Sequence, residues 1–437
     1  MVNLVITNAC NLACPFCFAS EYLADGAADA ERMSLEQFRR HVAWAGGDTV
    51  RFCGGEPTVH PDFLELLALA LDQDGRRAFI MTNGVWPDAV RRRLAELPTG
   101  QAVRITYLFN VLEPAFYTAA QAHMLDQTLA APNPLAITLG LTLHRADQDV
   151  DHVFHRARRH GIRRIRYSVA SPNATDPGSW LLDARRDFPA LAALVHRVVM
   201  EGRARGLTVH SDCGYIPPCL FTDAQRRDLE TPHPSAPGPA YTCNGPVDLG
   251  PTGEAWRCYG LYSVVRAHTR EHADAASLHD AFERRAHELG DANLLFDECA
   301  ACDWRARGQC AGGCYALRVT ATARQHASGA GVDLADDESL RAAVPRLNAG
   351  AFHVTGGRLP VLMVREDGAW APLDASPVEE RLLGCCDGVR DVGALAVELA
   401  RGLGRAVPVP EVARALRRLQ GRGVVGWVAA PGRGPLA

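Results

Sequence analysis

Three cysteines stand within eight positions near the start of the chain, in the stretch NACNLACPFCF (residues 8–18). Cys10, Cys14 and Cys17 form a C-x3-C-x2-C pattern directly after the apolar run VNLVIT. A structural zinc ion usually takes four protein ligands, and a disulfide joins two cysteines. Three thiolates instead suit a [4Fe–4S] cluster that leaves one iron without a protein ligand, and that iron can bind a small molecule directly.

A glycine-rich motif, CGGEPTVHP (53–61), follows a second apolar segment. Gly54 and Gly55 allow the backbone to approach a ligand closely. Glu56 offers a carboxylate to an ammonium group, in a charge-assisted hydrogen bond. Cys53 precedes the motif and has two interpretations. It could donate a hydrogen atom to a substrate radical, or it is a small buried strand residue.

Strand-like and helix-like segments alternate through the first 205 residues. The helix-like segment 34–44 begins with a capping box, Ser34 with Gln37 three residues later. Strict alternation predicts an α/β fold with a parallel sheet, here a partial (β/α)6 TIM barrel. In such a fold the chemistry lies on the loops at the carboxyl ends of the strands. The six expected strands are 3–7, 49–53, 78–83, 103–109, 135–143 and 164–170.

The three-cysteine loop after the first strand and GGEP after the second together resemble the radical S-adenosylmethionine (SAM) superfamily. The resemblance covers about residues 1–205. It implies that Cys10, Cys14 and Cys17 hold a [4Fe–4S] cluster whose open iron binds SAM. Reduction would then cleave SAM to methionine and a 5′-deoxyadenosyl radical that abstracts a hydrogen atom.

The same resemblance implies a set of residues that contact SAM. In this family GGEP holds the methionine amino group, an aromatic residue between the second and third cysteines lies near the adenine, and polar residues at later strand ends add contacts. The implied residues are Phe16, Gly54, Gly55, Glu56, Pro57, Asn83 and Asn110.

A second cysteine set resembles the SPASM domain, which carries two auxiliary [4Fe–4S] clusters in radical SAM enzymes that mostly modify peptides. The run from Cys299 to Cys314 departs from the family pattern, because seven residues separate Cys302 from Cys310 where five are usual. The family's last cysteine is also missing, while two extra cysteines lie upstream. The candidate ligands are Cys213, Cys219, Cys243, Cys258, Cys299, Cys302, Cys310 and Cys314.

Two divisions of these eight thiols are open. A cross-over arrangement, which the resemblance suggests, puts 219, 243, 258 and 314 on one cluster and 299, 302, 310 and 213 on the other. A sequential arrangement puts 213, 219, 243 and 258 on one cluster and the last four on the other. Zinc is an alternative for the last four. Cys385 and Cys386 lie further on, inside an expected helix, and are interpreted as small core residues.

The pattern predicts four segments. Residues 1–205 form the partial barrel, 206–325 a loop-rich iron–sulfur domain, 326–350 a linker, and 351–437 a small winged-helix-like α+β domain. The last segment resembles the RiPP recognition element (PqqD-like) of pyrroloquinoline quinone biosynthesis. That resemblance implies capture of a leader peptide by strand addition. A structural appendage is the alternative interpretation.

Composition excludes other classes of function. The 437-residue chain is 47% hydrophobic and 22% charged with a net charge of −4, so no basic field favours nucleic acid. We find no lysine, which excludes a lysine-anchored pyridoxal cofactor. Neither a signal peptide nor a run of membrane-spanning length is visible, so we expect a cytoplasmic protein without a membrane partner. Fourteen cysteines then favour metal sites or catalysis over disulfides.

The leading hypothesis is a radical SAM enzyme that modifies a ribosomal precursor peptide, most simply by crosslinking it, with a flavodoxin- or ferredoxin-type electron donor. A second hypothesis is dehydrogenation or epimerisation of a sugar or another small metabolite. A third is a non-catalytic, zinc-stabilised binding protein. Proton-transfer candidates stay unranked, and they are Asp212, Asp248, Tyr259 and Tyr315.

Overall fold

The computed structural model describes residues 1–20, 22–24, 30–173, 182–232, 241–243, 245–262 and 264–320, together with parts of 344–428. The chain divides into two compact units, Met1–Arg318 and Val319–Ala437. Each unit has a buried apolar core of its own.

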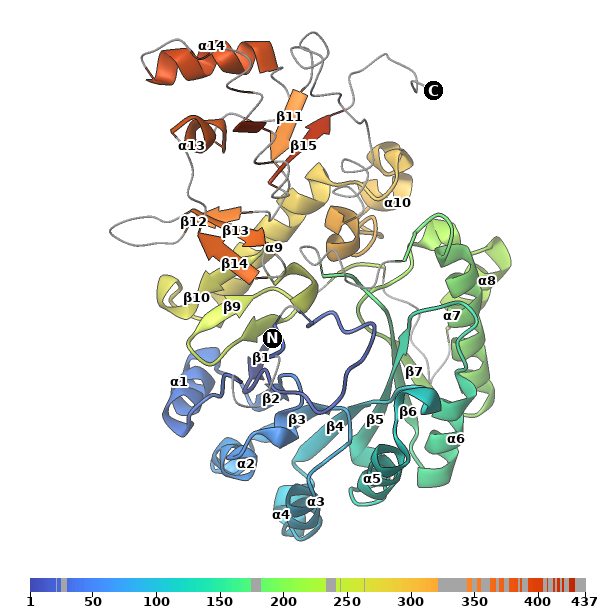
Figure 1. Ribbon diagram of the computed structural model, residues 1–437. Coiled ribbons are helices and arrows are strands. Elements are labelled where there is room, and N and C mark those ends of the chain that lie inside the picture. The colour runs from blue at the N-terminus through green and yellow to red at the C-terminus, as the bar shows by residue number, and fades with distance from the viewer. Residues whose placement is uncertain are drawn as a thin grey trace. The chain divides into compact units, whose positions relative to one another are not determined.

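The first unit is built on one ten-stranded sheet (Figure 1). β1 to β7 are parallel neighbours in chain order, and β8 pairs in parallel with the other edge of β1. β9 and β10 continue the sheet beyond β8 in antiparallel pairs. The strands are β1 (Val2–Val5), β2 (Thr49–Cys53), β3 (Arg77–Thr82), β4 (Ile105–Asn110), β5 (Ile137–Leu143), β6 (Arg164–Val169), β7 (Thr208–Ser211), β8 (Val247–Leu249), β9 (Glu254–Trp256) and β10 (Arg266–His268).

The α/β fold with a parallel sheet is confirmed, and the six expected strands correspond to β1–β6. β7, a four-residue strand, and the three short strands β8–β10 were not predicted from the sequence. Each of these falls within residues 206–325, which were expected to be loop-rich. The sheet therefore continues past residue 205, and the proposed division of the chain there stays a prediction.

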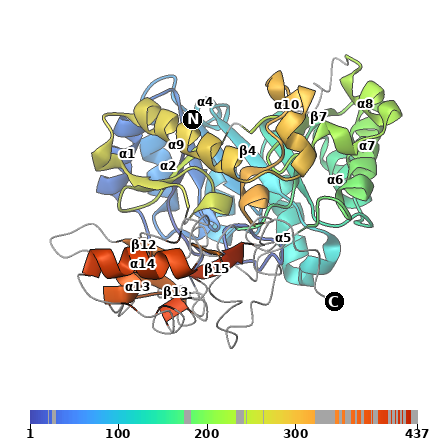
Figure 2. The same ribbon diagram turned by 90° about the horizontal axis from the view of Figure 1, so that it is seen from above.

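The helices of the first unit connect and cover the strands. α1 and α2 lie together at the β1–β2 end, and α6, α7 and α8 lie together at the β6–β7 end (Figures 1 and 2). The capping box of α1 forms as expected between Ser34 and Gln37. The helices are α1 (Leu35–Ala45), α2 (Phe63–Leu71), α3 (Asp88–Ala95), α4 (Thr99–Ala102), α5 (Ala119–Leu129), α6 (Asp151–His160), α7 (Phe188–Ala204), α8 (Asp223–Glu230), α9 (Ala275–Ala292) and α10 (Asp303–Ala306).

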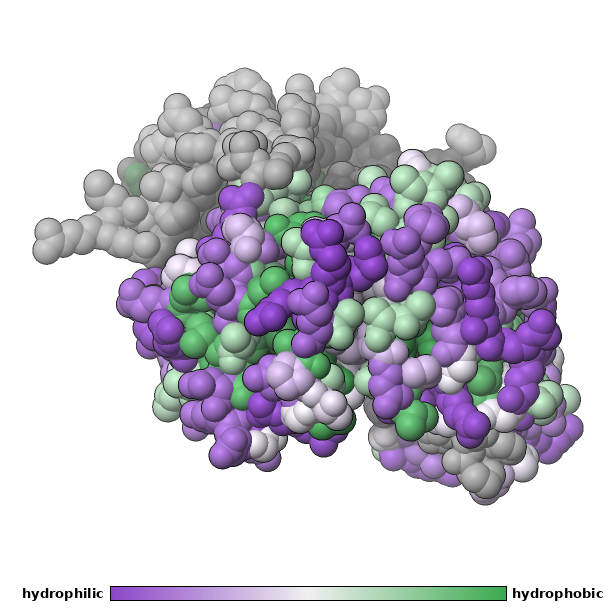
Figure 3. Space-filling model, turned by 90° about the horizontal axis from the view of Figure 1, so that it is seen from below, coloured by the Kyte–Doolittle hydropathy of each residue, from purple (hydrophilic) through white to green (hydrophobic). Residues whose placement is uncertain are grey.

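The two faces of the sheet differ in polarity. On the outer face, Phe52 of β2 packs against Phe38 of α1 and Phe63 of α2, with ring centroids 5.5 and 5.9 Å apart. Side chains alternate along a strand, so Arg51 and Cys53 point to the opposite face, here called the inner face. Seen from below, the helical exterior carries mainly hydrophilic residues (Figure 3). Within the described part of the chain, each helix is too short or too polar to cross a bilayer.

The second unit contains both strands and helices. β12, β13 and β14 form an antiparallel sheet, and β11 pairs with β15. Helical residues between 377 and 419 supply most of its apolar core, and Cys386 is buried there as expected. Cys385 lies outside the described residues. The elements are β11 (Val344–Leu347), β12 (Phe352–Val354), β13 (Leu362–Glu366), β14 (Ala369–Pro372), α13 (Pro377–Leu383), α14 (Val392–Leu403) and β15 (Val425–Val428).

The expected linker, 326–350, falls largely outside the described residues. The part that is described, Val344–Leu347, is strand β11 and pairs with β15. These four residues therefore belong to the folded second unit.

Candidate functional site

The three-cysteine loop leaves the carboxyl end of β1. The Cys17 amide donates to the Cys14 carbonyl at 3.1 Å, which closes a turn between these two cysteines. All three thiols are half-buried. Burial raises the pKa of Cys14 to about 12 and that of Cys17 to about 11, and charge on the neighbouring thiols adds to both shifts. A cation or a cluster is needed to stabilise these sulfurs as thiolates.

The glycines of GGEP pack against this cysteine loop. The Gly55 amide donates to the Thr7 carbonyl at 3.0 Å. A Cβ on Gly54 would lie 2.4 Å from the Thr7 oxygen, and one on Gly55 would lie 2.2 Å from the Ala9 oxygen and 3.0 Å from Cys10 Cβ. From the sequence we expected these glycines to make room for a ligand. The structure shows that they make room for the protein's own backbone beside Cys10.

Glu56 is fully buried at the end of β2. Its Oε1 accepts hydrogen bonds from the Thr58 amide, the Thr58 hydroxyl and the Thr82 hydroxyl at 3.1, 2.6 and 2.8 Å. Its Oε2 accepts a hydrogen bond from the Asn83 amide at 2.7 Å. Burial raises the pKa of Glu56, while these four bonds lower it. Pro57, also buried, begins the short 3-10 helix that follows.

Asn83 connects GGEP to the cysteine loop. Its side-chain amide donates to Asn11 Oδ1 at 2.8 Å and lies 3.9 Å from Cys10 Sγ. Its own Oδ1 accepts from the Val85 amide at 2.8 Å. The carboxyl ends of β1, β2 and β3 are therefore tied together around Cys10.

Phe16 lies in an aromatic group at the ends of β4 and β5. Its ring stacks on His144 at 4.3 Å between centroids and meets Phe116 edge-on at 6.1 Å. Burial lowers the pKa of His144, and Glu113 Oε2 lies 3.5 Å from its Nε2. His144 and Glu113 were missed from the sequence. The available signal was their place directly after strands, where polar side chains gather in parallel sheets.

Asn110 is exposed at the last position of β4. It faces Gly140 of β5, where a Cβ would lie 2.4 Å from Asn110 Oδ1. The absence of a side chain at Gly140 leaves the Asn110 side chain its space. The structure brings Asn83 into contact with Cys10 and Glu56, whereas Asn110 lies beside Gly140 of β5.

Cys53 lies on the inner face, beside polar groups that come from distant parts of the chain. Its sulfur is 4.0 Å from the Tyr259 hydroxyl, and burial raises its pKa to about 12. Nearby, Asn3 donates to the buried Asp248 at 2.7 Å and accepts from Arg51 at 2.8 Å. Burial raises the pKa of Asp248 to about 7, against the opposing effects of Asn3 and Arg51.

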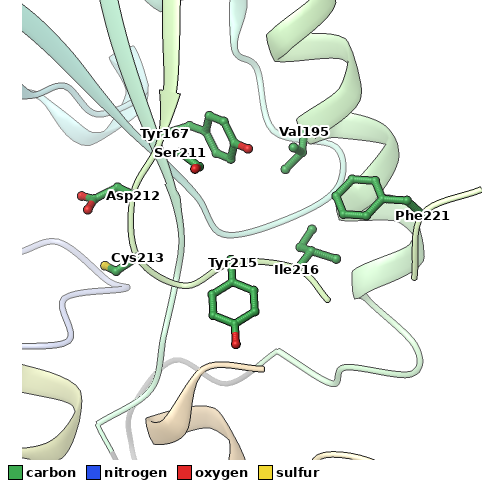
Figure 4. Close-up of a pocket in the computed structure, with 8 residues that line it drawn as sticks. All are labelled: Tyr167, Val195, Ser211, Asp212, Cys213, Tyr215, Ile216 and Phe221. Atoms are coloured by element: carbon green, nitrogen blue, oxygen red, sulfur yellow. The ribbon is translucent and has the colours of Figure 1, made fainter. Parts of the chain in front are cut away.

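The chain turns sharply after β7, at the first two cysteines of the second set. Asp212 and Cys213 point to one side of this turn and Tyr215 to another (Figure 4). Gly214 has φ +69°, and a Cβ there would lie 1.8 Å from the Val169 oxygen. Asp212 forms an ion pair with Arg166 of β6. The turn separates Cys213 from Cys219, which lies in the next short helical segment.

Four of the eight thiols share one electrostatic neighbourhood near the sheet. Desolvation and then Asp212, Cys314 and Cys258 raise the pKa of Cys213. Burial also raises the pKa of Cys258 to about 12, with further contributions from Cys243 and Cys314. We call Cys213, Cys243, Cys258 and Cys314 the proximal thiols.

The other four thiols form a second neighbourhood. Desolvation and then Cys310, Cys299 and Cys302 raise the pKa of Cys219. Desolvation likewise raises the pKa of Cys310, and Cys299 and Cys302 contribute to that shift. We call Cys219, Cys299, Cys302 and Cys310 the distal thiols. Both divisions considered from the sequence put Cys219 with Cys243 and Cys258, and the assignment of the eight thiols to individual clusters stays a prediction.

The donor chemistry around these sulfurs fits iron–sulfur clusters. The Gly312 amide donates to Cys310 Sγ at 3.2 Å, and Arg257 donates to Cys243 Sγ at 3.3 Å. Among the described residues, no three Cys, His, Asp or Glu side chains meet closely enough to hold one metal ion. A [4Fe–4S] cluster places each thiolate on a separate iron, so its ligands need not meet at one point.

Of the unranked candidates, Tyr315 lies near the proximal thiols, with its hydroxyl 3.2 Å from His287 Nδ1. Tyr259 follows Cys258 and contacts Cys53. Arg51, Arg257 and Glu283 were missed from the sequence. Their roles depend on side-chain contacts between residues far apart in the chain, which no local pattern records.

Comparison with known proteins gives one family match. Residues 4–112 match the family described as the radical SAM superfamily. The chain is 36% identical over 90 residues to 7,8-dihydro-6-hydroxymethylpterin dimethyltransferase of Methanocaldococcus jannaschii, and this alignment covers 20% of this chain and 17% of that protein. It is 33% identical over 87 residues to GTP 3′,8-cyclase of Pectobacterium atrosepticum, and this alignment covers 19% of this chain and 26% of that protein.

Among solved structures, crystal structures of Streptococcus suis SuiB align with this chain, one of them bound to S-adenosylmethionine. The alignment has a TM-score of 0.47 at 16% identity and covers 72% of each chain. The matches span 17% and 26% of the length of these two relatives. The three-cysteine loop, GGEP and Asn83 all lie within residues 4–112, the part of the chain that matches the radical SAM superfamily.

Proposed function

We propose that this chain is a radical SAM enzyme that modifies a ribosomal precursor peptide. The observation that carries the proposal is the convergence at Cys10. Gly55 packs on Cys10 Cβ, and Asn83 contacts Cys10 while its backbone amide binds Glu56. Three separate motifs thus meet at one of the three thiols that would hold the cluster.

Cys10, Cys14 and Cys17 would hold a [4Fe–4S] cluster that leaves one iron open. When bound, this cluster supplies the electron that cleaves SAM to a 5′-deoxyadenosyl radical. Glu56 Oε2 accepts one hydrogen bond among the described residues, whereas Oε1 accepts three, so Oε2 keeps acceptor capacity for the SAM ammonium group. Phe16 would contribute its ring to the adenine site.

The proximal and distal thiols would each hold an auxiliary [4Fe–4S] cluster. Each set offers four sulfurs, which is the number that a fully protein-bound cluster requires. The N–H groups of Arg257 and Gly312 that donate to sulfur favour the thiolate form in each set.

The second unit would capture the leader segment of the peptide. In the described residues its three-stranded sheet has β12 and β14 as outer strands. An outer strand offers backbone donors and acceptors to an added peptide strand. Crosslinking is the outcome that we propose for the peptide.

Anaerobic reconstitution tests the proposal. The full chain should bind roughly twelve irons from three four-iron clusters. With reductant or a flavodoxin-type donor it should release 5′-deoxyadenosine from SAM, and with a peptide encoded beside its gene it should give a product of altered mass. Zinc in place of iron would instead support a non-catalytic binding protein. Deoxyadenosine formed without any change in the peptide would remove the peptide substrate.

The place of Cys53 favours a second candidate. This thiol lies on the inner face beside Tyr259, where it could donate a hydrogen atom to a substrate radical. An epimerase of a sugar or another small metabolite would need such a donor. The Cys53→Ala variant should then no longer epimerise the substrate, so that the starting isomer or an oxidised product accumulates. No solvent deuterium should enter the substrate.

A further inference from the structure

Arg257 is a buried charge beside the proximal thiols. Only 1% of the surface of Arg257 is exposed. Nη1 donates to Cys243 Sγ at 3.3 Å, and Nη2 lies 3.3 Å from the Cys243 carbonyl oxygen. Nε donates to Glu283 of α9 at 2.9 Å. The guanidinium therefore bridges a candidate cluster ligand and a carboxylate.

The surroundings are shaped to accept this guanidinium. A Cβ on Gly245 would lie 2.4 Å from Nη1. The Tyr315 ring centroid lies 5.2 Å from the guanidinium carbon. Arginine stays protonated in proteins, and an enclosed charge is costly unless it is paired and hydrogen-bonded. Glu283 pairs with Nε and Nη2, and the sulfur of Cys243 accepts from Nη1.

Arg318 provides an internal comparison. It is equally buried, and its guanidinium carbon lies 5.3 Å from the same Tyr315 ring. Its guanidinium donates to the carbonyl oxygens of Asn293 and Ala311. The two arginines thus share burial and a ring but differ in whether they bond to sulfur.

We propose that Arg257 raises the reduction potential of the cluster held by the proximal thiols, and that Glu283 limits this effect. The inference rests on the proposed function, because it assumes a cluster at these thiols. Hydrogen bonds to cluster sulfurs and nearby positive charge both stabilise the reduced, more negative form. The effect is strong where water is excluded. Arg257 is therefore a positioning residue that makes this cluster a better electron acceptor.

The test is a redox titration of the full-length reconstituted protein, followed by electron paramagnetic resonance. The signal of the proximal cluster is the one that Cys258→Ala removes. Arg257→Met should lower the equilibrium constant for reduction of that cluster by about tenfold or more, which corresponds to a fall in reduction potential of about 59 mV for a one-electron couple. Arg318→Met, the matched control, should change the same equilibrium by less than about twofold.

Two outcomes would overturn the inference. One is an Arg257→Met protein with the full iron content and an unchanged potential. The other is a shift of equal size in Arg318→Met, which would show that general burial of charge is responsible. Wild-type protein with roughly four irons would overturn the auxiliary clusters themselves, so the two failures are distinguishable by iron content.

Glu283→Gln decides the case where Arg257→Met loses iron from the proximal site. This variant keeps the guanidinium and removes its counter-charge. The reduction potential should then rise, and the equilibrium constant for reduction should increase by about threefold or more. A purely structural role for the Arg257–Glu283 pair predicts no rise, and an unchanged or lowered potential would overturn the inference.

Discussion

The Asn83 backbone amide donates to Glu56 Oε2 at 2.7 Å, which links the loop after β3 to the buried carboxylate after β2. The side chain of Asn83 meanwhile reaches Asn11 and Cys10 in the loop after β1. One residue thus joins three strand ends through separate backbone and side-chain contacts, and these contacts can be tested separately.

Replacement of Asn83 by alanine should keep the backbone bond to Glu56 and remove the contacts to Asn11 and Cys10. Loss of such bonds costs about 1–3 kcal/mol, so 5′-deoxyadenosine formation should fall by about fivefold to 150-fold. Asn133→Ala is the control, because Asn133 is exposed and caps the turn before β5. Equal rates in the two variants would show that Asn83 does not act at the site.

Gly55→Ala should displace the three-cysteine loop, since the added methyl would lie 2.2 Å from the Ala9 oxygen. We expect loss of roughly four irons while the auxiliary irons stay bound. Gly100→Ala is the control, because nothing lies within 4 Å of a Cβ at that position. Iron analysis and spectroscopy measure both variants. Full iron content in Gly55→Ala would mean that the loop tolerates the methyl group.

The grouping of the eight thiols predicts which cysteine variants share a phenotype. Cys213→Ala should disturb the same cluster signal as Cys258→Ala, and Cys219→Ala should disturb the same signal as Cys302→Ala. The reason is the electrostatic neighbourhood of each pair. Paramagnetic resonance of the reduced variants reports the result. Cys219→Ala that affects the Cys258 signal would restore one of the divisions drawn from the sequence.

Asp248→Asn should change how stability depends on pH. The pKa of Asp248 is raised to about 7, against about 3.9 for an unfolded chain. Between these values the folded state binds a proton that the unfolded state lacks, so wild-type stability falls as pH rises from about 4 to about 7. The asparagine stays neutral and can still accept from Asn3. It should stabilise the protein at pH 8 by up to about 4 kcal/mol and by little at pH 4.

Urea unfolding at both pH values, followed by tryptophan fluorescence, measures the effect. Asp74→Asn, in the exposed turn before β3, serves as the control for loss of one charge. A benefit of Asp248→Asn that is equal at both pH values would exclude titration of Asp248 as its cause.

A chain that ends at residue 330 should lose peptide modification and keep uncoupled cleavage of SAM. The cut removes β11 together with its partner β15, and it keeps every candidate cysteine ligand. Iron content should therefore stay at roughly twelve per chain. Titration of a labelled leader peptide compares the full and shortened chains. Full modification by the shortened chain would remove the recognition role of the second unit.

The strand–helix alternation was sufficient to predict the parallel sheet because each of β1–β6 has a distinct apolar run bounded by polar residues. β7 and β8 are four and three residues long, and their patterns are too short to distinguish from loops. Their place in the sheet depends on long-range pairing. β8, for example, pairs with β1, although most of the sequence of the first unit separates the two strands.

The candidate site likewise contains some residues whose places could be predicted from the sequence and others whose places could not. The positions of Cys10, Glu56 and Asn83 followed from their places after consecutive strands. The role of Gly54 and Gly55 did not, because a glycine can make room for a ligand or for backbone, and the sequence contains no information on which neighbour is present. Between Cys213 and Cys219 the chain turns at one positive-φ glycine, Gly214, and this turn could not be placed from spacing.

The pairing of β1 with β8 has a consequence for the order of events during synthesis. Asn3 and Asp248, which bond at 2.7 Å, are 245 residues apart. At roughly 5–20 residues per second, the ribosome needs about 12–50 s to make the second partner after the first. Until then β1 lacks one of its two neighbours, and the cysteine loop at its end has no complete frame. Iron insertion at Cys10, Cys14 and Cys17 should therefore follow release of most of the chain, which leaves three early thiols exposed to oxidation in the nascent protein.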